Sequence, residues 1–230
     1  MTVSEDLRGR VAIVSPHLDD AVLSLGASIA RSNRVGATIT IVSVLAGQAS
    51  ATDPPGKWDE RAGFRSAGEA AAARAREDDD ACRIVGAKPV RLPFWDRQYA
   101  RGSTPEVIFQ AVVEASGDAD AVLLPGYPLT NEDHLWLTTL LLEKELANPR
   151  VGLYTEQPYA ALTQKAPRTL VGPDRPWVGL AADPDDQLVK LRACRAYASQ
   201  IPLLGGTPTL LGVLAYETRY GGESVSWIES

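Results

Sequence analysis

One short segment of the chain carries most of the groups that could do chemistry. An apolar run over 11–15 is followed at once by an imidazole and two carboxylates, those of His17, Asp19 and Asp20. A β-branched run that ends at proline and precedes an Ala- and Leu-rich amphipathic stretch predicts a strand over 11–15, a turn, and a helix over 21–32. Because open α/β sheets bind ligands at the carboxyl ends of their strands, this segment is a candidate active site. The alternative for one aspartate is a capping role at the start of the helix.

A second candidate group comes from the scarcity of histidine. The chain has only two histidines, and His134 follows a second apolar run over 121–125. If both imidazoles met one carboxylate of the first cluster, they would supply three N and O ligands and leave a position open for water, as in a catalytic zinc site. The alternative is that His134 is an ordinary core or surface histidine. Periodicity leaves both interpretations open.

Length and composition limit the class of protein. With 230 residues, 45% hydrophobic and 23% charged, the chain predicts one α/β domain over 1–230. The net charge of −6 argues against nucleic acid and favours a small-molecule partner. No apolar run is long enough for a membrane span, and residues 1–10 have no apolar signal core, so we expect a cytoplasmic protein. Cys82 and Cys194 lie far apart and are expected to be buried thiols on helices.

Hydrophobic periodicity predicts alternating strands and helices along the rest of the chain. Further strands are expected over 37–45, 89–92, 119–124 and 151–155, and further helices over 70–85, 105–116, 132–147 and 186–199. This alternation predicts an α/β, single-domain Rossmann-like fold, with a mostly parallel sheet flanked by helices and the active site at the C-terminal ends of the strands. Residues 47–68 are expected to be irregular. The alternating tail over 209–230 is expected to add an edge strand.

Several segments resemble one known family. Pro16-His17-Leu18-Asp19-Asp20-Ala21 resembles the His-Pro/Leu-Asp-Asp signature of the LmbE-like, or PIG-L, family of zinc-dependent N-acetylglucosaminyl deacetylases. The other similar segments are Arg74-x-x-Glu77-Asp78, Leu92 to Asp96, Asn131-Glu132-Asp133-His134, Tyr154-x-Glu156-x-Pro158-Tyr159, and Lys190 through Gln200. They occur in the family's order over about residues 10 to 200.

The resemblance implies a metal site and a general base. His17, Asp20 and His134 would hold zinc, and Asp19 would take a proton from the attacking water and return it to the leaving amine. Ferrous iron, Fe(II), is the alternative ion, because two imidazoles and a carboxylate accept either metal.

The resemblance also implies residues that bind a sugar. Arg74 and Asp96 match positions that border the sugar subsite, and both side chains can hydrogen-bond to hydroxyls in pairs. The alternative is a mutual salt bridge that braces a helix against a strand end. Trp58 and Tyr127 are weaker candidates for stacking on a sugar, and either could simply pack a loop.

The chain departs from the family pattern at Asn131, where family members commonly have histidine. An amide can donate a hydrogen bond to developing negative charge, as catalytic residues of an oxyanion hole do, but it cannot carry a proton. The alternative role for Asn131 is to cap the following helix.

Together these residues predict metal-dependent hydrolysis that removes an acetyl or other acyl group from an N-acetylated amino sugar or glycoconjugate. The alternative is a catalytically inactive family member that binds a glycoside or a partner protein; Asn131 motivates it, and the intact Asp19 weakens it. A nucleotide-sugar transferase is disfavoured, because no Gly-x-Gly-x-x-Gly follows the first strand. No pattern in the chain assigns an oligomeric state.

Overall fold

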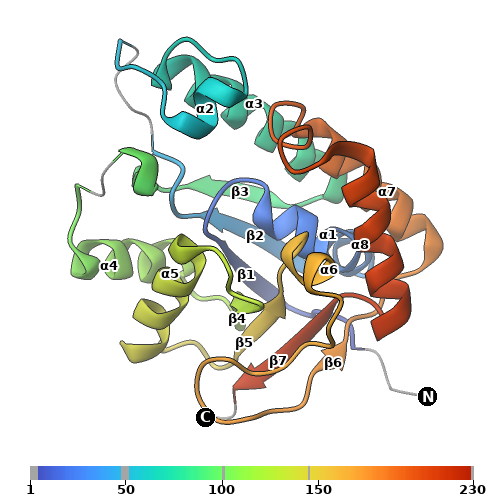
Figure 1. The fold of residues 1–230 in the computed structure, drawn as a ribbon. Coiled ribbons are helices and arrows are strands. Elements are labelled where there is room, and N and C mark those ends of the chain that lie inside the picture. The colour runs from blue at the N-terminus through green and yellow to red at the C-terminus, as the bar shows by residue number, and fades with distance from the viewer. Residues whose placement is uncertain (1–4, 48–51, 100–101, 145, 229–230) are drawn as a thin grey trace.

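A seven-stranded sheet lies at the centre of the molecule, in the order β3-β2-β1-β4-β5-β7-β6 (Figure 1). The computed structural model describes residues 5–47, 52–99, 102–144 and 146–228. The strands are β1 (Arg10–Ser15), β2 (Thr38–Ser43), β3 (Lys88–Arg91), β4 (Ala121–Tyr127), β5 (Val151–Thr155), β6 (Val178–Gly179) and β7 (Ser224–Ile228). The first five strands pair in parallel, whereas β7 pairs antiparallel with β5 and β6. The predicted α/β fold with a mostly parallel sheet is confirmed.

Helices cover both faces of the sheet (Figure 1). On one face lie α1 (Asp20–Arg34), α3 (Ala67–Val85) and α7 (Pro184–Ala196), and on the other lie α4 (Pro105–Ser116) and α5 (Glu132–Glu143). The shorter α2 (Lys57–Arg61) and α6 (Tyr159–Thr163) follow loops, and α8 (Gly206–Tyr220) packs against α6. In β1 alternate residues enter different clusters, Val11 and Ile13 one, Ala12 and Val14 the other. An uninterrupted apolar strand is therefore buried on both faces.

The order of the strands places a crevice at the centre of the sheet. From β1 the chain moves outward through β2 to β3, and it then returns to the other side of β1 as β4. The connections after β1 and β4 therefore leave the sheet in opposite directions. Ligands of open α/β sheets bind at such a switch point, beyond the carboxyl ends of the strands.

The C-terminal tail differs from the expectation of an edge strand over 209–230. It forms a helix, α8, and then β7, which lies between β5 and β6 and is not at the edge; residues 229–230 lie outside the described residues. The buried residues of α8 are Leu210, Val213, Tyr216 and Glu217, spaced three or four apart or adjacent, as one helix face requires. Over the part of the tail that forms α8, the expectation of a strand was wrong because it followed a period of two where the burial follows the helical period; the strand that does form is β7.

Other segments also differ from the expectation. The region over 47–68, expected to be irregular, contains the short helix α2, while 48–51 lies outside the described residues. The helix expected over 132–147 ends at Glu143, and position 145 is not described.

Cys82 on α3 and Cys194 on α7 are buried free thiols, as predicted. In the part of the chain that the structure describes, no helix combines the length and the apolar character needed to cross a membrane.

Candidate metal centre

Three potential ligand side chains converge beyond the carboxyl ends of β1 and β4. His17 follows β1, Asp20 begins α1, and His134 lies in the first turn of α5. The Nδ1 atom of His17 is 3.2 Å from Asp20 Oδ2 and 3.2 Å from His134 Nε2, and these last two atoms are also 3.2 Å apart. The two histidines of the chain are thus brought together with one aspartate.

This triangle has the size of one face of a tetrahedral metal site. Zinc binds nitrogen and oxygen at about 2.0–2.2 Å, which places ligand atoms of a tetrahedron roughly 3.3–3.6 Å apart. The observed separations of 3.2 Å are close to that value, and the donor set of two imidazoles and one carboxylate is one that zinc accepts. The residues could therefore hold a metal ion.

The turn after β1 is held by hydrogen bonds that aim Asp20 back at His17. The Ser15 hydroxyl donates to the His17 carbonyl at 2.5 Å and accepts the backbone N–H of Ala21 at 3.0 Å. The backbone N–H of His17 donates to Asp20 Oδ2 at 2.8 Å. The same carboxylate oxygen therefore faces both the His17 backbone and the two imidazoles.

A carboxylate also lies beside the outer nitrogen of each imidazole. The Nδ1–H of His134 donates to the carboxylate of Glu156, which is 1% exposed and also accepts the backbone N–H of Leu129 at 3.0 Å. Asp133 Oδ2 lies 3.6 Å from His17 Nε2. Such partners fix the ring orientation and leave the inner nitrogen free to bind a metal. The sequence placed Glu156 in a motif without giving it a role; its position directly after β5 was the available signal.

The charges of the cluster favour a cation at its centre. Burial opposes ionisation of Asp20, but His134 and His17 outweigh it and hold the pKa of this carboxyl far below its usual range. Burial would lower the pKa of His134, yet the carboxylates of Asp20 and Glu156 raise it to about 9. A group that attracts protons this strongly also attracts a metal ion.

Asp19 lies beside this triad without joining it. It occupies the N-cap position of α1, but its side chain makes no capping hydrogen bond, and the capping alternative is therefore wrong for Asp19. Burial, together with repulsion from Asp20, raises the pKa of Asp19 to about 6. A carboxyl group that titrates near neutrality can both accept and return a proton.

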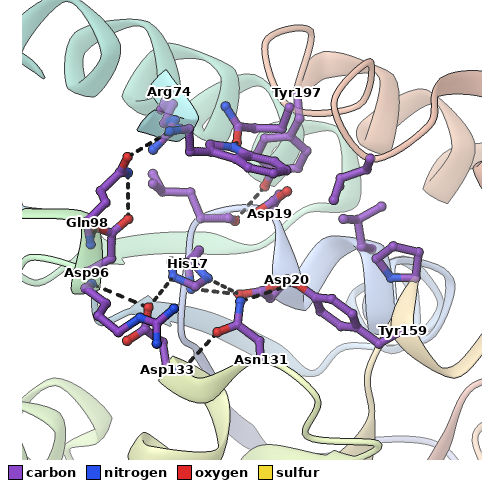
Figure 2. Close-up of a pocket in the computed structure, with 17 residues that line it drawn as sticks. His17, Asp19, Asp20, Arg74, Asp96, Gln98, Asn131, Asp133, Tyr159 and Tyr197 are labelled. Carbon is purple, nitrogen blue, oxygen red and sulfur yellow. Dashed lines mark hydrogen bonds and ion pairs between the residues drawn. The ribbon is translucent and has the colours of Figure 1, made fainter. Parts of the chain in front are cut away.

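A pocket of about 240 Å³ is lined by Asp19 and by two residues of the triad, His17 and Asp20 (Figure 2). Polar side chains on its lining include Arg74, Asp96 and Gln98, and apolar ones include Leu23, Pro158 and Leu204. The pocket therefore offers both hydrogen-bonding groups and apolar surface to one ligand.

Arg74 and Asp96 both line this pocket, but they do not pair with each other among the described ion pairs. Arg74 forms an ion pair with Asp59 of α2, a carboxylate that is 1% exposed and also accepts the Tyr99 hydroxyl. Asp96 accepts the backbone N–H of Gln98 at 3.0 Å and its side-chain amide at 2.9 Å (Figure 2). The mutual salt bridge is therefore wrong. Asp59, which the sequence left in an irregular region, takes that place.

Of the two aromatic candidates, one lines the pocket. Trp58 lies on its wall, where its indole N–H donates to Gln200 Oε1 at 2.7 Å. Tyr127 is 3% exposed and packs edge-on against Trp177, with ring centroids 6.4 Å apart. For Tyr127 the packing alternative holds.

Asn131 caps α5 and also lines the pocket. Its Oδ1 accepts the backbone N–H of Asp133 at 2.9 Å, which confirms the capping role. Its Nδ2 donates to the hydroxyl of Tyr159 at 3.4 Å. Tyr159, which has no role in the sequence-based prediction, packs edge-on against the ring of His134 with centroids 5.5 Å apart. Burial raises the pKa of the Tyr159 phenol well above its usual value.

The chain is similar to one family model and to several solved structures. The family model for PIG-L, GlcNAc-PI de-N-acetylase, matches residues 12–143. The A40926 pseudoaglycone deacetylase Dbv21 is 27% identical with a TM-score of 0.78, and the match covers 96% of this chain and 97% of that one. The N,N'-diacetylchitobiose deacetylase from Pyrococcus horikoshii is 20% identical with a TM-score of 0.64, over 95% of this chain and 82% of that one.

A third solved structure shares the fold but has a different activity in its name. GalB, the 4-carboxy-2-hydroxymuconate hydratase from Pseudomonas putida, is 17% identical with a TM-score of 0.67, over 96% of this chain and 97% of that one. A comparison with curated proteins finds no significant match. Because one fold carries more than one activity, the reaction has to be argued from the site.

Proposed function

Since the chain belongs to the PIG-L (GlcNAc-PI de-N-acetylase) family, we propose that it is a metal-dependent N-deacetylase that removes an acetyl or other acyl group from an N-acylated amino sugar or glycoconjugate. The observation that carries this proposal is the triangle of 3.2 Å separations formed by His17, Asp20 and His134, with Asp19 beside it. Dbv21 and the chitobiose deacetylase, whose names state deacetylation of the A40926 pseudoaglycone and of N,N'-diacetylchitobiose, support the substrate class.

The metal would be held by His17 Nδ1, Asp20 Oδ2 and His134 Nε2. When bound there, zinc lowers the pKa of a coordinated water toward neutrality and polarises the amide carbonyl. Ferrous iron fits the same donor set and is the alternative. Glu156 and Asp133 keep the two rings in the orientation that this requires.

Asp19 is the general base and then the general acid. It accepts a proton from the attacking water as the new C–O bond forms, and it gives that proton to the amine nitrogen as the C–N bond breaks. Asp20 is committed to the two imidazoles and the His17 backbone, so the neighbouring carboxylate is the one left to move the proton.

Arg74 and Asp96 would bind the hydroxyls of the amino sugar. Each is already held in place by a partner, Arg74 by Asp59 and Asp96 by Gln98, so little side-chain freedom is lost when the sugar binds. Asn131 also lines the pocket, and its amide N–H, which donates to the Tyr159 hydroxyl, would stabilise the oxygen that becomes negative during attack through that hydroxyl.

The proposal is tested by metal analysis combined with acetate release over a panel of N-acetylglucosaminyl compounds. We expect about one metal ion per chain, release of acetate from at least one compound, and no release by Asp19→Ala. Stoichiometric metal without acyl release from any compound, and unchanged glycoside binding in Asp19→Ala, would favour the alternative of a catalytically inactive member that binds a glycoside or a partner protein. That alternative is favoured by Asn131 alone. A cytoplasmic location remains part of the proposal.

A further inference from the structure

We propose that Tyr159 is a further catalytic residue, whose hydroxyl donates a hydrogen bond to the amide oxygen of the substrate as that oxygen becomes negative, and that Asn131 is the positioning residue that aims it. This inference rests on the proposed deacetylase function and assigns a residue of that same site.

The orientation of the Asn131 amide is fixed by the helix that it caps. Its Oδ1 accepts the backbone N–H of Asp133 at 2.9 Å, so the amide nitrogen must face the other way. In that direction lies the Tyr159 hydroxyl, 3.4 Å from Nδ2. An amide nitrogen only donates, and the phenol oxygen is therefore the acceptor in this contact.

The phenol hydrogen of Tyr159 is consequently left for another acceptor. Among the described residues, the contact with Asn131 is the only hydrogen bond of this hydroxyl, and it uses the oxygen and not the hydrogen. Tyr159 is partly buried and lines the pocket, so the pocket is the space from which an acceptor for this hydrogen can come.

The position of Tyr159 suits an oxygen that develops charge beside the metal centre. It begins α6, three residues after Glu156, and its ring packs against His134. Figure 2 shows the side chain reaching from the β5 side of the pocket toward Asp20 and Asn131, opposite the wall that carries Asp96 and Gln98. A sugar held by that wall would therefore present its amide to the tyrosine side.

In the proposed role, Tyr159 donates a hydrogen bond but transfers no proton. As the water oxygen bonds to the carbonyl carbon, the π electron pair moves onto the carbonyl oxygen, which accepts the hydrogen bond from Tyr159 while the phenol keeps its proton. When the C–N bond breaks, that pair returns to restore the C=O bond, and the proton held by Asp19 goes to the amine nitrogen. The tyrosine thus supplies a donor that strengthens during the reaction, which is how an oxyanion hole lowers a barrier.

The first test compares Tyr159→Phe with Tyr216→Phe. Loss of one oxyanion donor costs about 10²- to 10³-fold in kcat, so we expect a fall of about 100-fold for Tyr159→Phe with KM changed less than about twofold. Tyr216 donates its hydroxyl to the Lys165 carbonyl at 2.7 Å, away from the pocket, and its variant should keep the wild-type rate. A Tyr159→Phe rate within about threefold of wild type would overturn the inference.

A binding measurement separates catalysis from a structural role. Binding is measured by calorimetry with a tetrahedral methylphosphonamidate analogue of the N-acetyl group. The affinity of Tyr159→Phe for this analogue should fall by about the same factor as its kcat, while its affinity for the free amino sugar stays unchanged. An equal loss of affinity for the analogue and for the amino sugar would show that the phenol only shapes the pocket, and would overturn the inference.

The role of Asn131 is tested by Asn131→Ser, because serine keeps a capping oxygen and lacks the amide N–H. We expect about a tenfold fall in kcat, and no additional fall when Asn131→Ser is added to Tyr159→Phe, since the asparagine acts through the phenol. If the falls in kcat of the two single variants multiplied in the double variant, the positioning role would be contradicted.

If Tyr159→Phe is as active as wild type while Asp19→Ala is inactive, the inference fails and the deacetylase function stands. If wild type releases no acyl group from any substrate, both fail.

Discussion

Two clusters of buried ionisable side chains in this molecule both contain carboxylates, but they differ in whether they contain a permanent cation. In the first, Asp20 meets two imidazoles at the floor of a pocket. In the second, Lys190 of α7 lies in the core with its Nζ 2.6 Å from Glu217 Oε1 and 2.6 Å from Glu223 Oε1. Both clusters are carboxylate-rich, yet only the second includes its own permanent cation.

This difference indicates which of the two clusters could bind a cation from solution. Lys190 neutralises its carboxylates from within, and Glu223 also accepts the backbone N–H groups of Ala27 and Ser28 at 3.1 and 2.7 Å, so α1, α7 and the start of β7 are braced together. The triad instead brings three potential ligand atoms within 3.2 Å of one another. The first cluster could therefore take up an external cation, whereas the second is balanced from within and is a structural brace.

The largest expected effect comes from the two adjacent aspartates. Asp20→Asn removes the anionic ligand, so we expect loss of both bound metal and acyl release. Asp19→Asn should keep the metal and lower kcat by roughly 10²- to 10⁴-fold, because only proton transfer is removed. Metal content and acyl release measured on both variants check this pair. Metal loss in Asp19→Asn with retention in Asp20→Asn would reverse the assignment.

The next largest effect is on stability. Lys190→Met leaves two buried carboxylates without a cation and should lower the free energy of unfolding by about 3–5 kcal/mol, measured by chemical denaturation. The double variant Lys190→Met/Glu217→Gln should lose less than Lys190→Met, because one uncompensated charge is gone. A double variant less stable than the single one would contradict the view of this cluster as a balanced brace.

The same variant should also change how stability depends on pH. Burial, partly offset by Lys190, raises the pKa of Glu217 from 4.5 to about 7. The folded state thus binds more protons than the unfolded chain between these values, and this group's contribution to stability falls as pH rises through that window. Removing Lys190 raises the folded pKa further, so Lys190→Met should continue to lose stability from pH 7 to 8, where wild type changes less. If the free energies of unfolding of wild type and Lys190→Met ran parallel from pH 7 to 8, this prediction would be contradicted.

A smaller effect separates the buried carboxylates of the two clusters. Glu156→Gln weakens the support of His134 and should reduce metal affinity about 10- to 100-fold in a chelator competition assay. The matched variant Glu217→Gln changes a buried carboxylate of the lysine cluster and should leave metal affinity as in wild type. Equal losses in both variants would show that the clusters are not independent.

The smallest effect is expected at the rim of the pocket. Arg97 and Glu132 form an ion pair there, but their side chains are 64% and 71% exposed. Solvent screens such a pair, so Glu132→Gln should change the free energy of unfolding by less than about 1 kcal/mol. A loss comparable to that of Lys190→Met would mean that burial is not what distinguishes these pairs.

The sequence predicted the parts of the site that depend on local pattern and strand order. The run 11–15 followed by His17 and Asp20 predicted a strand, a turn and a helix, and the structure confirms them. The apolar runs before His17 and His134 left the convergence of the two rings open, and the resemblance to the family implied it; the structure brings the rings together.

The parts that the sequence missed depend on contacts between distant segments. Asp59 lies on a short helix in an irregular region, and nothing local marks it as the partner of Arg74. The support of His134 by Glu156 and the contact of Asn131 with Tyr159 need β4 and β5 to be neighbours in space. In the tail, mixed apolar and polar residues fit both periods, and only packing selects the helix.

The most direct test of the account is anomalous diffraction from crystals grown with zinc. We predict one strong peak, within coordination distance of His17 Nδ1, Asp20 Oδ2 and His134 Nε2, and no peak beside Lys190. A crystal with full zinc occupancy elsewhere and these three atoms unbound would contradict the central claim that the triad is a metal centre.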